Sequence, residues 1–178
     1  LVKGFEMVKQ KPLINSVSAE KERYEQFLPI IDGKDCAVVA LLMSDKGTPT
    51  GVDDRVETTD FLVEKLTGAG VAVSDIFVDP CVLPASSAPG SGKDFILAIQ
   101  KIKEKYPEIH ITGGLSNVSY GLPNRKLLNR IFIAMCIAAG LDSAIANPMD
   151  REFMDAISAA EALIGLDEYC MNYLTAQR

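Results

Sequence analysis

The chain has 178 residues, of which 48% are hydrophobic and 24% charged, and it contains no repeated or low-complexity tract. This composition predicts one globular domain with a sizeable core. The 24 acidic residues outnumber the 18 basic ones, and no basic cluster offers the positive surface that a nucleic acid requires. The apolar runs are far shorter than the ~20 residues that span a bilayer. We therefore expect neither nucleic acid nor a membrane as a partner.

In chain order, the hydrophobic pattern and the turn residues predict eleven elements. They are a helix at 1–10, a strand at 13–17, a helix at 18–31, a strand at 36–43, a helix at 53–69, a strand at 76–84, a helix at 94–105, a strand at 109–112, a helix at 126–139, a strand at 142–146 and closing helix over 149–175. The run at 36–43 is continuously apolar, which is typical of a parallel strand covered on both faces.

Several positions have local roles that follow from residue type. Ser18 is the expected N-cap of the helix at 18–31. The segment Gly90-Ser-Gly-Lys93 resembles a phosphate loop only superficially, because Ser87 and Asp94 replace required residues, and we expect a solvated loop there. His110 lies inside an apolar strand, which favours a structural role. Asp45 is expected to be a loop carboxylate, although it follows a strand and could contact a ligand.

The cysteines are widely spaced, lie in apolar contexts and form no C-x-x-C pair. They are Cys36, Cys81, Cys136 and Cys170. Such cysteines behave as small hydrophobic residues and favour a reducing, cytoplasmic location. One histidine and scattered cysteines do not make a zinc or iron-sulfur site, so we predict no metal site in the chain.

Five β-α units in succession predict a parallel sheet with right-handed crossovers. Polar residues follow the apolar core of each strand, namely Asn15, Asp45, Asp79, Ser116 with Asn117, and Asn147. Polar residues at every strand end favour a (β/α)8 barrel, whose active site lies at that rim, over an open sheet with one switch point. A complete barrel takes ~250 residues. We therefore expect residues 1–178 to be a single domain made of the last five β-α units, with about three units preceding Leu1.

Four segments point to a known family. They are residues 13–20 (LINSVSAE), 77–84 (FVDPCVLP), 114–125 (GLSNVSYGLPNR) and 139–146 (AGLDSAIA). In this order and at this spacing they closely resemble the methyltetrahydrofolate-dependent corrinoid methyltransferases, whose pterin-binding TIM-barrel fold is shared with dihydropteroate synthase and with the folate module of cobalamin-dependent methionine synthase. The resemblance implies a pterin-binding barrel that lacks its first three β-α units.

The resemblance also implies a reaction and its participants. The N5 methyl group of methyltetrahydrofolate would pass to a cobalt(I) corrinoid (cobalamin) carried by a partner protein, or in the reverse direction. Asp79 matches the family's pterin carboxylate, and an ionised carboxylate can accept both hydrogen bonds from the pyrimidine edge. Asn15 matches the amide at the opposite edge, and Asn117 matches the catalytic residue near N5. Asn117 could also cap the helix that follows.

Three further residues are expected to contact the substrate. Gly114 and Ser116 would let the backbone approach the ring closely. Arg125 would meet the acidic tail of the folate or a partner protein. Members of the family often form dimers, and the apolar carboxyl-terminal helices leave room for a homodimer.

Two other functions remain open. The chain could be a noncatalytic fragment or pterin-binding module that needs another polypeptide to complete its barrel, because a second pterin-binding Asp of the family would lie upstream of Leu1. A condensation like that of dihydropteroate synthase is the less favoured alternative, because that pattern has a Lys-containing segment after the seventh barrel strand, and Gly114-Leu-Ser-Asn-Val-Ser119 has none.

Overall fold

The computed structural model describes residues 2–177. A four-stranded, all-parallel sheet in the order β1-β2-β3-β4 forms its centre. The strands are β1 (Leu13–Ala19), β2 (Ala37–Ser44), β3 (Ile76–Asp79) and β4 (His110–Ile111). The α-helices are α1 (Val2–Met7), α2 (Lys21–Ile31), α3 (Gly51–Gly68), α4 (Ser91–Lys105), α5 (Arg125–Ala139), α6 (Arg151–Leu163) and α7 (Met171–Ala176). Short 3-10 helices are η1 (Val73–Asp75), η2 (Leu115–Ser119) and η3 (Glu168–Cys170).

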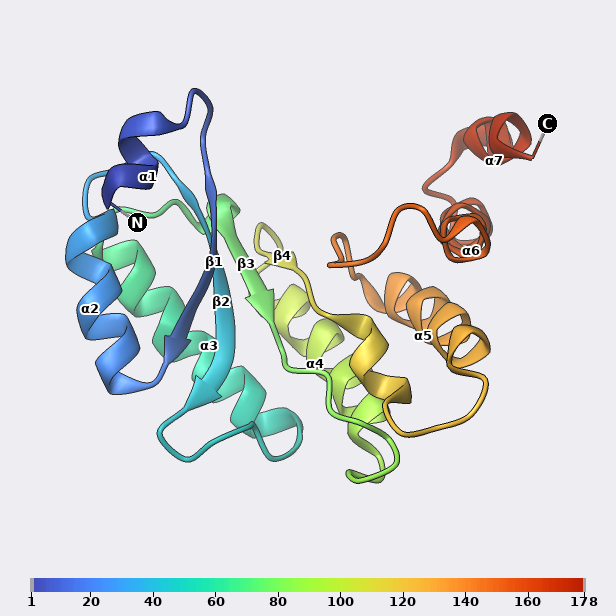
Figure 1. Ribbon diagram of the computed structural model, residues 1–178, viewed down its shortest axis with the longest axis horizontal. Coiled ribbons are helices and arrows are strands. Elements are labelled where there is room, and N and C mark those ends of the chain that lie inside the picture. Colours follow the sequence, from blue (N-terminus) through green and yellow to red (C-terminus); the bar gives the residue numbers. More distant parts are fainter. Residues whose placement is uncertain (1, 178) are drawn as a thin grey trace.

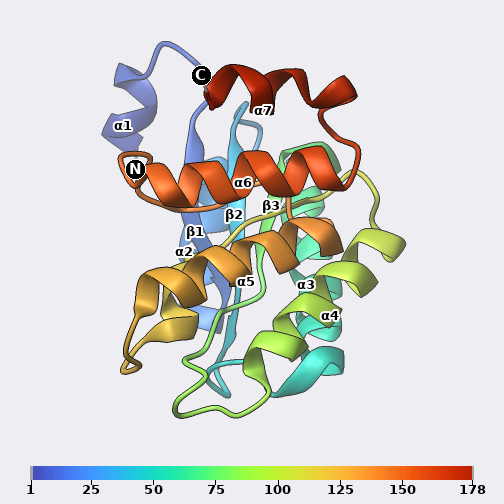
Figure 2. The same cartoon turned by 90° about the vertical axis from the view of Figure 1, so that its right-hand side faces the viewer.

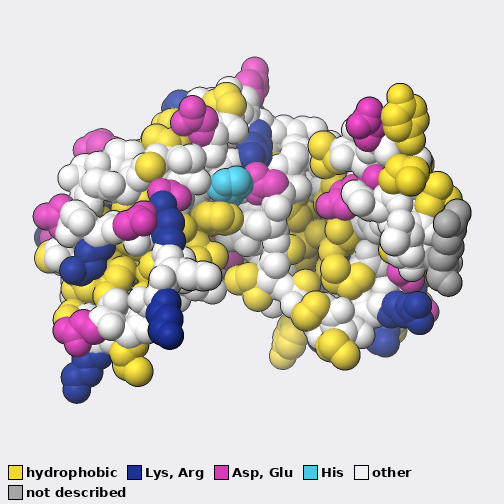
Figure 3. All heavy atoms as spheres, turned by 90° about the horizontal axis from the view of Figure 1, so that it is seen from above, with side chains coloured by type: hydrophobic (Ala, Val, Ile, Leu, Met, Phe, Trp, Pro, Cys, Tyr) yellow, Lys and Arg dark blue, Asp and Glu magenta, His cyan; other side chains and the backbone are white. Residues whose placement is uncertain are grey.

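The helices between consecutive strands cover one face of the sheet, and α5, α6 and α7 continue the helical layer beyond β4 (Figures 1 and 2). Seen from the end at which the strands begin, the molecule has two lobes with an open hollow between them (Figure 3). Strands on the concave side and helices on the convex side are the arrangement of a barrel wall. The predicted parallel α/β fold is confirmed, and the curved sheet has the form of part of a barrel wall.

The core lies between the sheet and the helical layer. β2 is paired on both sides, with β1 and β3, and its Val38, Ala40 and Leu42 are at most 1% exposed. From α4, Phe95 packs against Phe132 of α5 with ring centroids 5.8 Å apart. This apolar packing orients the strand ends that carry the site.

The predicted Ser18 cap is wrong. β1 continues through Ala19, because its pairing with β2 extends to the Ser18–Leu41 and Ala19–Ser44 positions. Ser18 is 2% exposed, and its Oγ donates a hydrogen bond to the Glu20 carboxylate. The first free amide of α2, Lys21 N–H, is instead satisfied by the carboxylate of Asp45, at 3.2 and 3.3 Å to its two oxygens.

The predicted strand at 142–146 is not formed as a regular strand. Ser143 and Ile145 donate backbone hydrogen bonds to Ile111 and Gly113, so the segment runs beside β4. However, the N–H of Ile111 donates to the side chain of Asp142 at 2.8 Å rather than to a backbone carbonyl. A side chain therefore replaces one rung of the ladder. The fifth β-α unit is present in position but lacks a regular strand.

Other predicted boundaries differ as well. β3 ends at Asp79 rather than at 84, because Pro80 offers no N–H and Cys81 takes a positive φ of 60°. α4 begins at Ser91, so most of the segment 90–93 is the first turn of a helix rather than a loop. The closing helix is two helices, α6 and α7, interrupted after Leu163 where Gly165 has a φ of 81°.

The four cysteines are free thiols. Cys36, Cys81 and Cys136 are buried as expected, whereas Cys170 is exposed, because it lies in the short turn before α7. The helix predicted at residues 1–10 is α1, and Leu1 lies outside the described residues. Within residues 2–177, no helix is long and apolar enough to cross a membrane, and no group of His, Cys, Asp and Glu is suited to hold a metal ion.

Candidate pterin site

The candidate site begins with Asp79, the last residue of β3. Its side chain is half-buried at the carboxyl end of the sheet, and its Oδ1 accepts a hydrogen bond of 3.0 Å from the N–H of Cys81. Burial raises the pKa of Asp79 to about 6, and the Cys81 hydrogen bond opposes that rise. A carboxylate that is partly desolvated and has few protein partners is suited to receive donors from a ligand.

Gly113, which follows β4 closely, forms the wall beside this carboxylate. A Cβ at Gly113 would lie 3.4 Å from Asp79 Oδ1 and 3.4 Å from Phe95 Cζ. Gly113 was not among the predicted site residues, although the Gly-Gly pair after the strand was a signal for close approach. At Gly114 the protein leaves more room, since a Cβ there would meet only Asn117 Nδ2, at 3.8 Å.

Asn117 lies on η2, the 3-10 turn that follows these glycines. Both Ser116 and Asn117 are exposed, and the N–H of Asn117 donates to the carbonyl of Gly114 at 3.2 Å. This hydrogen bond places Asn117 close to Gly114, and the preceding residue, Gly113, lies beside Asp79. Asn117 does not cap the next helix, because the N-cap residue of α5 is Asn124.

Arg125, the first residue of α5, contacts the same turn. Its Nη2 donates to the carbonyl of Ser116 at 2.8 Å, and its Nε donates to Ser119 Oγ at 3.0 Å. Ser119 is fully buried, and its hydroxyl lies 2.7 Å from Asn129 Oδ1. Arg125 therefore holds the backbone that bears Asn117, a role that the sequence analysis did not foresee.

The two loops that bear Asp79 and Asn117 are connected by two hydrogen bonds. The N–H of Ala85 donates to the carbonyl of Val118 at 2.9 Å, and Ser86 Oγ donates to the carbonyl of Tyr120 at 2.8 Å. Both bonds link the β3–α4 loop to the β4–α5 connection. The carboxylate and the amide consequently belong to one hydrogen-bonded rim.

Asn15 lies apart from this group. It is the third residue of β1 rather than the end of the strand, and it is exposed. Its partner in β2 is Val39, which pairs in turn with Phe77, two residues before Asp79. Two inter-strand spacings of ~4.8 Å put Asn15 about 10 Å across the sheet from β3. The structure thus brings Asp79, Gly114, Ser116, Asn117 and Arg125 to one rim and leaves Asn15 apart from them, on β1.

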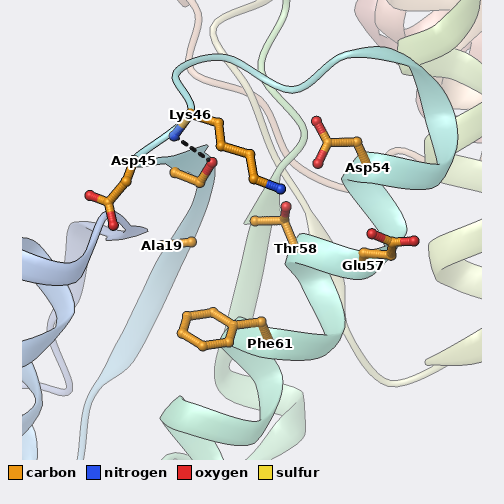
Figure 4. Close-up of a pocket in the computed structure, with 8 residues that line it drawn as sticks. Ala19, Asp45, Lys46, Asp54, Glu57, Thr58 and Phe61 are labelled. Carbon is orange, nitrogen blue, oxygen red and sulfur yellow. Dashed lines mark hydrogen bonds between the residues drawn. The ribbon is translucent and has the colours of Figure 1, made fainter.

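A hollow of about 270 Å³ lies further along the rim, at the ends of β1 and β2 (Figure 4). Lys46 extends over it, with Asp54 and Glu57 of α3 on the opposite wall (Figure 4). Two of its carboxylates have structural partners, because Asp45 binds the first amide of α2 and Asp54 accepts the N–H of Thr50 at 2.7 Å. Asp45 is accordingly a helix cap, and the hollow borders the candidate site without containing its groups.

One buried residue near Asp79 was not predicted at all. Arg55 of α3 is 1% exposed, and its guanidinium donates to the carbonyls of Pro80 and Cys81, at 2.7 and 3.2 Å. Arg55 lies in no sequence motif, and the charged residues in the first turns of α3 are typical of a solvent-exposed helix face. The contact arises only when α3 packs behind β3.

A parallel α/β fold with a desolvated carboxylate and a glycine-lined turn at its rim is the architecture expected of a pterin-binding protein. The family model described as "Pterin binding enzyme" matches residues 4–147, and the chain belongs to that family. The chain is 40% identical over 176 residues to the methylcorrinoid:tetrahydrofolate methyltransferase of Eubacterium limosum, an alignment that covers 98% of this chain and 65% of that protein.

Two further comparisons concern a longer protein and a solved structure. The methionine synthase of Mycobacterium tuberculosis is 31% identical over 176 residues, covering 92% of this chain and 15% of that protein. The fold is similar to that of a dihydropteroate synthase from Coxiella burnetii in complex with pteroic acid, with a TM-score of 0.59, 11% identity, and coverage of 93% of this chain and 71% of that one. The chain thus spans just under two thirds of the first curated relative and a much smaller part of the second.

Proposed function

We propose that this chain is the larger part of a methyltransferase that moves the N5 methyl group of methyltetrahydrofolate to a cobalt(I) corrinoid on a separate protein, or runs that transfer in reverse. The main support is the half-buried Asp79 beside Gly113, on the same rim as the Gly114–Asn117 turn. The printed name of the Eubacterium limosum relative supports the choice of methyl transfer. The free cysteines are compatible with the proposed cytoplasmic location.

Asp79 would bind the pyrimidine edge of the pterin. That edge presents an amino group and a ring N–H side by side, and an ionised carboxylate accepts both. One oxygen of Asp79 already accepts the N–H of Cys81, which orients the carboxylate in its plane. Asn15, on β1, would meet the opposite edge of the ring with an amide that both donates and accepts. The width of two strand spacings between β1 and β3 is compatible with a flat bicyclic ring between them.

Asn117 would act at N5, the atom whose bond to the methyl group breaks in the reaction. A neutral tertiary amine is a poor leaving group, so N5 must gain a proton or a strong hydrogen bond as the methyl group departs. The corrinoid supplies the cobalt nucleophile, and the protein supplies orientation and hydrogen bonding that strengthen in the transition state. The exposed amide of Asn117 can donate to N5 or relay a proton from water.

The remaining site residues would position the ring and the turn. A Cβ at Gly114 has space among the protein atoms, so a requirement for glycine there would come from the ring lying over the backbone. Ser116 would line the same surface. Arg125 already holds the carbonyl of Ser116, and its exposed guanidinium could also reach the acidic tail of the folate.

The alternative of a binding module that needs more polypeptide also has support in the structure. In the part of the chain that the structure describes, β1 is an edge strand with one unpaired side, and Leu13 at its start is 51% exposed. An open edge of this kind invites pairing with a further strand. The alternative differs from the leading proposal in predicting pterin binding without methyl transfer.

The test uses two variants of the full-length protein. Asn117→Ala should lower the rate of cob(I)alamin methylation by about 100-fold or more, because it removes a transition-state hydrogen bond, while changing the Kd for methyltetrahydrofolate less than about threefold. Asp79→Ala should mainly raise that Kd. The rate is measured from the absorbance change of the corrinoid, and the Kd by calorimetry. Unchanged turnover in Asn117→Ala would show that Asn117 has no role at N5.

A further inference from the structure

Arg55 is a buried cation without a carboxylate partner among the described residues. Its guanidinium donates to three backbone carbonyls: Nε to Pro80 at 2.7 Å, Nη2 to Cys81 at 3.2 Å and Nη1 to Gly51 at 2.7 Å. Burying a guanidinium costs several kcal/mol unless hydrogen bonds satisfy it, and an apolar residue would fill the same space on α3 at lower cost. The choice of arginine at position 55 therefore calls for a reason other than packing.

The hydrogen bonds point to that reason. The carbonyl of Pro80 and the N–H of Cys81 belong to one peptide group, which is planar and rigid. Arg55 Nε binds the carbonyl end of this group, and Asp79 Oδ1 accepts from its N–H end. The guanidinium and the carboxylate are thus joined through a single rigid unit, in which each hydrogen bond polarises and strengthens the other.

The backbone conformation of the turn at Cys81 requires stabilising contacts. Cys81 has a φ of 60°, in the left-handed region that residues other than glycine rarely adopt. A strained conformation persists only where surrounding contacts fix it. Arg55 contacts the carbonyls on both sides of the Cys81 Cα, and Asp79 contacts its N–H. Without Arg55, the turn could relax and take the Cys81 N–H away from Asp79.

We propose that Arg55 is a positioning residue for pterin binding: through the Pro80–Cys81 peptide, it fixes the orientation of the Asp79 carboxylate. This inference rests on the proposed function of Asp79. It assigns to α3, a helix on the outer face of the sheet, a part in ligand binding. The guanidinium itself need not contact the ligand.

The test compares variants of Arg55 in the full-length protein. Arg55→Lys keeps the charge but loses the planar set of donors, which an ammonium group cannot reproduce. Arg55→Gln keeps a planar N–H donor without the charge. Both are expected to raise the Kd for methyltetrahydrofolate by about tenfold, which corresponds to about 1.4 kcal/mol, and to change kcat less than about threefold. Wild-type affinity in both variants would overturn the proposal.

A matched control separates positioning from general stability. Leu62 is fully buried two turns further along α3, and Leu62→Ala should lower the melting temperature at least as much as the Arg55 variants while leaving the Kd within about threefold of wild type. If Leu62→Ala weakened binding as much as Arg55→Lys at a matched loss of stability, the effect would be structural and the positioning role would be wrong.

The pH dependence of binding gives a second readout. The titratable neighbour of Asp79 is the Cys81 thiol, on the same loop, and uncharged Gly113 lies beside Asp79 from the β4 side. The charges that act on Arg55 are those of Asp54 and Asp94. Losing the Cys81 hydrogen bond removes the contact that lowers the pKa of Asp79. In Arg55→Lys, affinity should therefore fall at a higher pH than in wild type, whereas Leu62→Ala should keep the wild-type pH. An unshifted profile in Arg55→Lys would overturn the proposal.

An Asp79→Asn variant distinguishes the two levels of failure. If wild type does not bind methyltetrahydrofolate, or if Asp79→Asn binds it as tightly as wild type, the proposed function itself is wrong. If Asp79→Asn weakens binding while Arg55→Lys and Arg55→Gln do not, only the positioning role of Arg55 is wrong.

Discussion

Asp79 destabilises the ligand-free protein at neutral pH, and under the proposed function the same carboxylate would bind the pterin. Burial raises its pKa from 3.8 to about 6, so the folded state holds a carboxylate that would prefer to be neutral. Because the folded pKa is the higher one, the stability that the group contributes is fully present below pH 3.8 and is lost as the pH rises through about 6. At neutral pH the whole cost is present, and donors from a pterin would offset it.

Replacing the Asp79 carboxylate by an amide should therefore have opposite effects on stability and on ligand binding. Asp79→Asn should raise the free energy of unfolding of the ligand-free protein at pH 7.5 by on the order of 1–2 kcal/mol, allowing for partial exposure, since the amide oxygen can still accept the Cys81 N–H. At pH 5 the gain should be smaller, because part of the wild-type carboxylate is then protonated. Thermal melts at both pH values measure the difference, and a less stable variant at pH 7.5 would contradict the argument.

The ionisation of Asp79 should also make the affinity for methyltetrahydrofolate depend on pH. Wild-type affinity for methyltetrahydrofolate should decrease as the pH falls through about 6, because a protonated Asp79 can no longer accept both pyrimidine donors. Asp79→Asn should bind weakly at every pH between 5 and 8. A wild-type affinity that stayed constant over this range would mean that the ionised carboxylate does not bind the ring.

At the residue scale, the sequence predicted Asp79 and Asn117 as site residues because each lies in a short motif after a strand that resembles a motif of the family. It could not identify Arg55, whose contacts with Pro80 and Cys81 join residues 25 and 26 positions apart and exist only after α3 packs on the sheet. Gly113 was missed for a related reason. Its significance depends on Asp79 and Phe95, which approach it from two other elements.

At the scale of the elements, strand and helix positions followed from apolar runs, whereas their ends did not. Ser18 looks like a helix cap in sequence, but β1 continues past it because Leu41 and Ser44 of β2 extend the pairing. The segment at 142–146 looks like a strand, but the Asp142 side chain takes the place of a backbone acceptor. Both errors come from long-range hydrogen bonds that no local pattern encodes.

The η2 turn offers a test at this scale. Ser119 is fully buried and its hydroxyl joins Arg125 Nε to Asn129 Oδ1, so Ser119→Ala removes one hydrogen bond from each of these groups. The variant should lower the free energy of unfolding by about 1–3 kcal/mol. Because the loosened turn bears Asn117, the rate of methyl transfer should fall by about tenfold or more while the Kd for methyltetrahydrofolate changes less than about threefold.

The matched control is Thr67→Ala on α3, whose hydroxyl also bonds within the protein, to the carbonyl of Val63 at 2.7 Å, but away from the rim. Stopped-flow absorbance of the corrinoid and calorimetry would provide the rates and affinities. If Ser119→Ala and Thr67→Ala had the same methyl-transfer rate, the hydrogen bonds of η2 would have no part in positioning Asn117.

At the scale of the whole molecule, the sheet ends in two unequal edges. Among residues 2–177, β1 pairs only with β2, and at the other side the segment 142–147 contributes two backbone hydrogen bonds beyond β4. Apolar side chains are exposed at both edges, with Leu13 at 51% and Ile145 at 52%. In a closed barrel, further strands would satisfy both edges.

The edges therefore predict a specific pattern of hydrogen exchange. In the 178-residue chain, the amides of β1 should exchange at least about tenfold faster than those of β2, because β2 is paired on both sides and its residues Val38 and Ala40 are fully buried. In a longer polypeptide that adds strands beside β1, protection of β1 should rise toward that of β2, while β2 serves as the internal reference. Mass spectrometry of peptic fragments measures both. Equal protection of β1 and β2 in the 178-residue chain would mean that the edge is already covered, for example by a second copy of the chain, and would remove the structural support for further strands.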